Sequence, residues 1–132
     1  MIAIRSLEQN EVYDALNLVK EVFFSEGNLG YSRQGAQSFL EFLSAKGELL
    51  EYLGAYDAAL EGILAYTEDF HIALLFVRKE RQKTGIAKGL FQEFLKLAKA
   101  RAVSRITVNA AKPAVPVYEA LGFEAYGEET TK

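Results

Sequence analysis

The most constraining feature of this chain is a buried strand that passes through a charged turn straight into an amphipathic helix, all between residues 71 and 91. Residues 72–77 form a short apolar run, which is typical of a strand buried on both faces. After the turn, apolar side chains recur at the spacing that keeps one helical face apolar, at Ile86, Leu90, Phe94 and Leu97. This succession predicts a fold in which helices pack on a sheet.

The turn is basic, and it ends where a helix begins. Residues 78–88 hold five basic side chains and one acidic side chain, a net charge of +4, in a chain whose formal charge is −3. The basic residues are Arg78, Lys79, Arg81, Lys83 and Lys88. A helix N-terminus offers unpaired N–H groups and about half a positive charge. A basic turn alone is usually a solvated surface, but beside Gly85 and a helix start it favours an anion site.

Two short motifs give a family resemblance. The segment Gln82-Lys83-Thr84-Gly85-Ile86-Ala87 resembles the Q/R-x-x-G-x-G/A signature of the GNAT superfamily, the acetyl-CoA-dependent N-acetyltransferases. The segment Tyr118-Glu119-Ala120-Leu121-Gly122-Phe123 lies about where that family has its YxxLGF segment. The turn is not a P-loop, because its lysine and threonine precede the glycine. The chain is identified as similar to small, single-domain, bacterial-type members of the family.

Composition excludes several classes of protein. The 132 residues suffice for one domain, residues 1–132, and half of them are hydrophobic, which excludes a disordered chain. With no cysteine and one histidine, a thiol nucleophile is excluded and no metal site is expected. No stretch approaches the ~20 apolar residues that span a membrane, and the N-terminus reads as a strand rather than a signal peptide. We therefore expect a cytoplasmic protein that binds neither membrane nor nucleic acid.

Apolar periodicity and turn residues predict the remaining elements. Strands are expected at 2–6, 49–56, 60–66, 72–77, 105–109 and 123–126, and helices at 12–23, 32–47, 85–102 and 113–121. Ser32 is expected to cap the second helix and Gly47 to end it. Gly62 weakens its strand or marks a bulge. The order βααβββαβαβ matches the GNAT layout, which implies an α/β (α+β) fold: a mixed, mostly antiparallel six-stranded sheet with helices on both faces.

The predicted sheet lacks one strand that is usual in the family. Relatives continue past the YxxLGF strand into a seventh strand, whereas residues 127–132 form a polar tail without apolar alternation. The sheet is then expected to expose unpaired groups beside 123–126 and 106–108. Because exposed strand edges invite pairing, we expect a homodimer or a crystal partner that covers this edge, or else a disordered C-terminus with a visible groove.

The resemblance implies a site for acetyl-CoA. The backbone of residues 82–87 would hold the pyrophosphate, with Lys88 as a further contact. Backbone N–H groups of Leu75, Phe76 and Val77 would be free for pantetheine and for the oxyanion, because the strand splays from residues 106–108 in the family. Asn109 either reaches the pantetheine amides or is a residue of the strand-end turn.

Two residues are candidates for proton transfer to and from the reacting groups. Tyr118, in the YxxLGF motif, would assist the departing thiolate; its alternative is a core tyrosine. His71 is a candidate general base, since an imidazole suits base catalysis near neutrality and similar histone-type enzymes carry a glutamate at this offset. Strand alternation predicts His71 on the same side as Leu75 and Val77. The alternatives are a structural histidine satisfied by a turn carbonyl, or a base role taken by water.

The acceptor site is the least defined. By resemblance, the loop between the first two helices and the early strands would line it, which implicates Phe24, Glu26, Tyr31 and Tyr66. This lining would suit a small amine or an aminoacyl group, although each residue could equally be ordinary core or surface. The rival reading is a non-catalytic acyl-CoA-binding or protein-interaction module. Ala111 is a departure from the family pattern that favours this rival, because relatives often have asparagine seven residues before the tyrosine.

Overall fold

The structure, a computed structural model, describes residues 2–25, 32–82, 84–108 and 118–119. Within these ranges five strands form one sheet in the order β1-β2-β3-β4-β5. The strands are β1 (Ala3–Ser6), β2 (Glu51–Asp57), β3 (Ala59–Tyr66), β4 (His71–Val77) and β5 (Thr107–Val108). Neighbouring strands are antiparallel except for β4 and β5, which are parallel. The expected mixed, mostly antiparallel sheet is therefore confirmed; the predicted strand 123–126 and the tail 127–132 lie outside the described residues.

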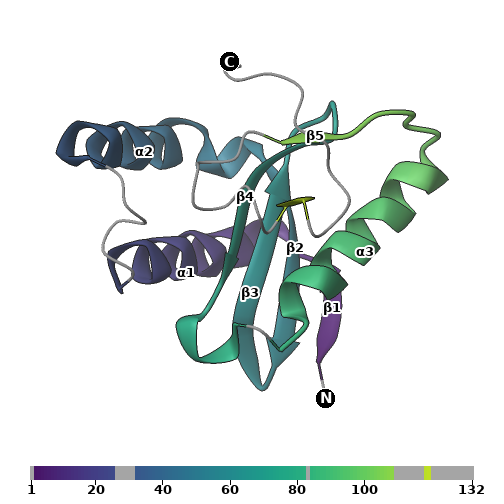
Figure 1. The fold of residues 1–132 in the computed structure, drawn as a ribbon, viewed down its shortest axis with the longest axis horizontal. Helices are drawn as coiled ribbons and strands as arrows, with labels where there is room; N and C mark the ends of the chain where they lie inside the picture. The colour runs from purple at the N-terminus through teal and green to yellow at the C-terminus, as the bar shows by residue number, and fades with distance from the viewer. Residues whose placement is uncertain (1, 26–31, 83, 109–117, 120–132) are drawn as a thin grey trace.

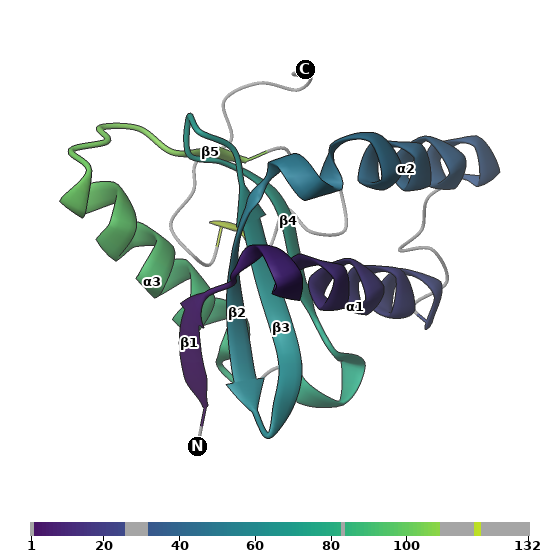
Figure 2. The same cartoon turned by 180° about the vertical axis from the view of Figure 1, so that it is seen from behind.

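Helices cover both faces of this sheet. Besides three 3-10 turns, η1 (Gln9–Glu11), η3 (Gly47–Leu49) and η4 (Lys79–Arg81), the helices are α1 (Val12–Ser25), α2 (Arg33–Lys46) and α3 (Ile86–Ala100). Helices α1 and α2 lie on one side of the sheet and α3 on the other, as Figures 1 and 2 show from opposite directions. The expected two-faced arrangement is confirmed for the described helices.

The ends of α2 match the sequence prediction only in part. The Ser32 hydroxyl accepts a hydrogen bond from the Gly35 N–H at 3.0 Å, which is the predicted N-cap. Gly47 does not end the helix through a left-handed conformation: its φ is −55°, and the chain continues into η3. Glycine instead allows close packing at this position, since a Cβ at Gly47 would lie 2.8 Å from the Leu16 side chain. As a consequence, Leu49 belongs to η3 rather than to β2.

Two apolar layers sandwich the sheet. In the first, rings from α1, α2 and β4 pack in series: Phe23 stacks on Phe39 at 4.7 Å, and Phe39 lies 5.9 Å from Phe76. In the second, Phe94 of α3 lies 5.2 Å from Phe70 and 5.0 Å from Tyr66. Aromatic pairs at such distances add to the free energy of area burial. Strand β4 therefore has a core on each side, as its apolar run predicts.

A bulge in β4 changes which side chains share a face. Ala65 of β3 pairs with Leu74, but the next residue, Tyr66, pairs with Ile72, so Ala73 is an extra residue. Leu74 and Ala73 both pack with the α1–α2 layer, whereas Ile72, Leu75 and Val77 pack with the α3 layer. The His71 ring contacts the Thr107 hydroxyl, and the neighbours of Thr107, Ile106 and Val108, pack with the α3 layer, so His71 lies on the α1–α2 side. The alternation that placed it with Leu75 and Val77 is therefore wrong, because one inserted residue reverses the alternation.

A second bulge brings the start of α3 close to β3. Between Ala55 and Tyr56 the β3 partner changes from Gly62 to Leu60, so Glu61 is the extra residue and Gly62 follows it, as its sequence position suggested. A Cβ at Gly62 would lie 2.9 Å from Ile86 Cγ2 and 3.3 Å from the Phe76 carbonyl oxygen. The absence of a side chain here lets the first residue of α3 rest directly on the sheet.

We expect Gly62→Ala to lower the free energy of unfolding by roughly 1–3 kcal/mol, the usual cost of overpacking. Urea unfolding measures this change. A double-mutant cycle with Ile86→Ala separates the contact from other effects, because removing the Ile86 branch should recover part of the loss. Strict additivity in that cycle would contradict the proposed close approach.

Candidate functional site

The N-terminus of α3 is open for a ligand. Gly85 precedes the helix with φ 92° and ψ 2°, a left-handed conformation that favours glycine. Apart from its chain neighbours, no heavy atom of the described residues lies within 4 Å of the place where its Cβ would be, and this N-cap residue has no side chain to bond the helix N–H groups. The first intrahelical bond runs from the Gly89 N–H to the Gly85 carbonyl at 2.9 Å, so the earlier N–H groups lack an intrahelical acceptor. An anion fits this helix end.

Side chains of the preceding loop fix its shape. The Gln82 amide donates to the Val77 carbonyl at 3.0 Å, which ties the loop to the end of β4. The Thr84 hydroxyl donates to the Arg81 carbonyl. Two residues of the predicted signature thus donate hydrogen bonds to backbone carbonyls, one at the end of β4 and one in the loop. Lys83 lies outside the described residues.

Two of the five basic residues are already neutralised. Arg78 forms ion pairs with Glu21 of α1 and, at 3.9 Å, with Glu61 of β3. Arg81 binds Asp57 at 3.1 Å and approaches Glu61 at 3.8 Å. The hydrogen bond from Arg81 lowers the pKa of the Asp57 carboxyl. The local charge of +4 therefore overstates the positive field at this loop.

Arg78 and Arg81 instead hold the loop in place. Besides these acids, the Arg78 guanidinium donates to the Leu60 carbonyl at 2.9 Å. The Arg78 backbone N–H donates to the Glu61 carbonyl at 2.9 Å. These contacts anchor the loop to the β2–β3 hairpin and to α1. The helix N-terminus, rather than the basic cluster, is therefore what favours an anion at this end of α3.

One edge of β4 is only partly paired. Strand β5 pairs with His71 and Ile72, and within the described ranges no strand pairs with residues 73–77 on that side. The side chains of Phe76 and Val77 are buried and that of Leu75 is half-buried, so the backbone edge is what this segment can offer a ligand. The predicted partner Asn109 lies outside the described residues.

His71 is held at the start of β4. Its Nδ1 lies 2.7 Å from the Thr107 hydroxyl, and its backbone N–H donates to the Thr67 hydroxyl at 3.3 Å. Burial lowers the pKa of the imidazole, which favours the neutral ring. The ring partner is thus a hydroxyl rather than the turn carbonyl considered from sequence. Sequence reasoning missed Thr107, because the register of β5 against β4, His71 beside Thr107, is set only by the folded sheet.

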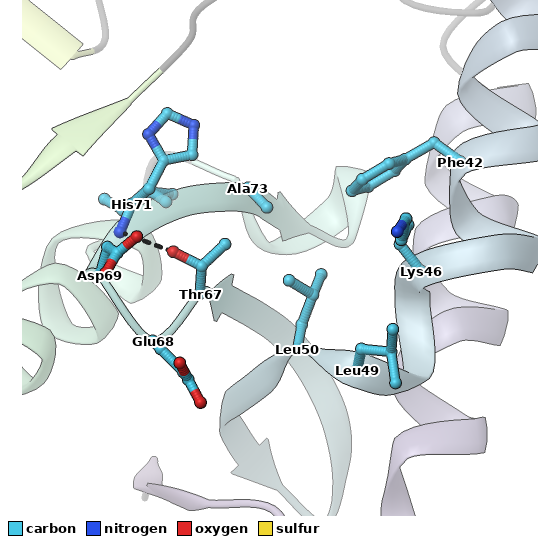
Figure 3. A pocket seen from close by; sticks show the side chains of 10 residues that line it. Phe42, Lys46, Leu49, Leu50, Thr67, Glu68, Asp69, His71 and Ala73 are labelled. Carbon is cyan, nitrogen blue, oxygen red and sulfur yellow. Dashed lines mark hydrogen bonds between the residues drawn. The ribbon is translucent and has the colours of Figure 1, made fainter.

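A pocket of about 590 Å³ opens beside His71, between the end of α2 and the β3–β4 turn. Its lining comes from both walls: Phe42, Lys46, Leu49, Leu50, Thr67, Glu68, Asp69, His71, Ile72 and Ala73. Figure 3 shows Phe42 and Lys46 extending from α2, with His71, Asp69 and Glu68 across from them. A pocket of this size suits a small molecule.

Of the predicted acceptor residues that the structure describes, neither Phe24 nor Tyr66 is among the side chains that line this pocket. Tyr66 is only 2 % exposed and packs under α3, because the β4 bulge sets it opposite Ile72, on the α3 side of the sheet. Its place in the acceptor site stays a prediction. Phe24 is 58 % exposed near the end of α1, with its ring 5.8 Å from that of Phe23. Glu26 and Tyr31 lie outside the described residues. Apart from His71, the pocket-lining residues form no motif by which sequence reasoning could have found them.

Tyr118 is half-buried in a helical piece with Glu119, and the rest of the predicted helix 113–121 lies outside the described residues. Its role stays a prediction. In the described part of the chain, no group of three or more metal-ligating side chains occurs. No helix there is long and apolar enough to cross a membrane.

Comparisons with known proteins agree with this architecture. A family model described as an acetyltransferase (GNAT) domain matches residues 28–132. A search of curated proteins finds no match. Among solved structures, PaiA N-acetyltransferase from Thermoplasma acidophilum in complex with coenzyme A has a TM-score of 0.80 at 18% identity, covering 96% of this chain and 91% of its own.

Two further structures align over the whole chain. A predicted acetyltransferase from Clostridium acetobutylicum, crystallised with acetyl-CoA, has a TM-score of 0.70 at 20% identity, covering 100% of this chain and 96% of its own. An aminoglycoside acetyltransferase from an uncultured soil metagenomic sample has a TM-score of 0.70 at 25% identity, covering 100% and 97%. Since the family model spans most of the sequence, the chain belongs to the GNAT acetyltransferases, a family of acyltransferases.

Proposed function

We propose that this protein transfers the acetyl group of acetyl-CoA to a primary amine by direct attack of the amine on the thioester. One observation supports the proposal above all. The first N–H groups of α3 and the partly unpaired edge of β4 lie on either side of one short loop. The structures with acetyl-CoA and coenzyme A among the relatives support the same choice of donor.

The chain offers a suitable length of backbone for the donor. The first N–H groups of α3, with Lys88 beside them, suit the pyrophosphate. The pantetheine arm has about twelve bonds, roughly the length of four extended residues. Four residues back along β4 from Val77 is Ala73, roughly 13 Å away. When bound, the donor supplies an activated acetyl thioester, and backbone N–H groups of 73–77 would stabilise the negative charge that develops on its oxygen.

His71 is proposed as the general base. Its lowered pKa keeps the imidazole neutral near pH 7, which is the form that accepts a proton. A base needs a free lone pair on Nε2, so Nδ1 must carry the hydrogen and donate it to the Thr107 hydroxyl, 2.7 Å away. We therefore assign Thr107 as a positioning residue that selects this tautomer. The bulge at Ala73 supports the assignment, because it turns His71 toward the pocket.

Tyr118 is proposed to assist the departing thiolate. Reference pKa values of about 10 for tyrosine and about 8.5 for a thiol make complete proton transfer unfavourable by about 2 kcal/mol. The hydroxyl would therefore act by donating a hydrogen bond to the developing charge. Proton transfer would follow later or through water.

The reaction itself is tested by incubating the protein with acetyl-CoA and a panel of primary amines while following thiol release. Amine-dependent release is the expected result. Binding of coenzyme A without any amine-dependent release would identify the chain as the rival class, a non-catalytic acyl-CoA-binding module.

The donor site is tested at Gly85. We expect Gly85→Asp to weaken coenzyme A binding at least tenfold more than Gly85→Asn, measured by calorimetry. Asparagine tolerates the left-handed conformation and has the same shape, so the pair isolates the repulsion between a carboxylate and the pyrophosphate. The difference should shrink at high salt. Equal affinities of the two variants for coenzyme A would show that the pyrophosphate does not bind at this position.

The base is tested by the pH dependence of kcat/KM. Because only the neutral imidazole accepts a proton, activity should be lost as pH falls through a pKa below the usual 6.5. His71→Ala should remove this acidic limb and leave coenzyme A affinity unchanged. Thr107→Val should shift or weaken the limb while Thr107→Ser restores it. If His71→Ala leaves the pH dependence of kcat/KM unaltered, His71 is not the base, and water takes that role.

The acid role is tested by Tyr118→Phe. We expect kcat to fall ~10²-fold, the lower range for a positioned proton donor, with little change in the Michaelis constant for acetyl-CoA. The hydroxyl acts on charge formed late in the reaction, which explains the split. A change in kcat within about twofold would mean that Tyr118 only packs.

A further inference from the structure

We propose that the pocket beside His71 is the acceptor site, and that its substrate is a small primary amine attached to an apolar body. This inference rests on the proposed acetyl transfer, and it adds the place and the chemical class of the acceptor. The pocket lies on the α2 side of β4, opposite the layer under α3. Donor and acceptor would then approach β4 from different directions and meet near Ala73.

The pocket wall is unusually apolar for a surface. Phe42 is 36 % exposed and Leu49 is 75 % exposed, and both lie at the pocket with Leu50 behind them. Large apolar side chains left in water around a concavity favour a ligand with apolar surface to bury. The side chains come from the end of α2 and from η3, two elements joined by the tightly packed Gly47, which holds the wall in place.

The charged groups of the pocket favour a cation. Glu68 and Asp69 occupy the exposed β3–β4 turn, and Lys46 lies across from them (Figure 3). None of these three has a hydrogen-bond or ion-pair partner in the part of the chain that the structure describes. Two carboxylates against one ammonium leave the mouth negative, because His71 is neutral. Such a mouth attracts an alkylammonium. The ammonium loses its first proton to water, and His71 accepts the second proton as the free amine attacks the thioester carbon.

The balance between these two features selects a class of amine. A polycationic sugar would need more carboxylates than two, and it would leave the Phe42 and Leu49 surfaces uncovered. A small polar amine such as ethanolamine would also leave them uncovered. An amino acid would add a carboxylate to a mouth that is already negative. A monoamine with an aromatic or aliphatic body satisfies both the acidic mouth and the apolar wall.

The test compares 2-phenylethylamine with ethanolamine, two primary amines of similar basicity, under saturating acetyl-CoA. We expect kcat/KM for 2-phenylethylamine to be at least tenfold higher. Leu49→Ala should reduce that preference several-fold. The matched control is Leu95→Ala, which removes an exposed leucine from α3 on the opposite face and should change nothing.

The acidic mouth is tested by the double substitution Glu68→Gln and Asp69→Asn. It should raise KM for both amines several-fold and reduce the salt dependence of kcat/KM, with coenzyme A affinity unchanged. Turnover of amines without the predicted preference, or equal effects of Leu49→Ala and Leu95→Ala, would overturn the pocket assignment while leaving acetyl transfer intact. Failure to bind coenzyme A or to acetylate any amine would instead refute the proposed function, and the pocket assignment with it.

Discussion

The arrangement depends on burial of β4 between two apolar layers. Leu74 and Phe76 pack against α1 and α2, while Leu75 and Val77 pack toward α3. A strand with a core on both faces cannot slip by one residue without exchanging every side chain between the two layers. Its two ends are therefore fixed in space: the C-terminal end delivers the chain to the start of α3, and the N-terminal end holds His71 at the pocket.

Polar contacts fix the loop between β4 and α3 after apolar packing has positioned the strand. The arginines of the loop form ion pairs with acids of α1 and of the β2–β3 hairpin. The loop is thereby anchored without filling the helix N-terminus that follows it. Gly62 contributes by lacking a side chain, which lets Ile86 rest on the sheet. The loop that leads into α3 and the wall of the pocket beside His71 are thus built from separate parts of the protein.

Helices on both faces of the sheet were implied by the family resemblance. Periodicity was enough to predict the described helices and strands and the Ser32 cap, because these follow from contacts between near neighbours in sequence. It failed for His71, because a single extra residue at Ala73 reverses strand alternation and leaves no trace in composition. The count of charges in residues 78–88 overstated the free charge of Arg78, whose partner Glu21 is far away along the chain. The His71–Thr107 contact and the pocket likewise depend on long-range register, which one sequence does not provide.

The central claim is that the donor binds from the start of α3 along the edge of β4. Amide hydrogen exchange with and without coenzyme A tests it most directly, because the first N–H groups of α3 have no intrahelical acceptor and should exchange rapidly in the free protein. We predict that coenzyme A slows exchange in residues 84–89 and 73–77 and leaves the pocket wall at 42–50 unchanged. Slowed exchange at 42–50, with no change at 84–89, would contradict the account.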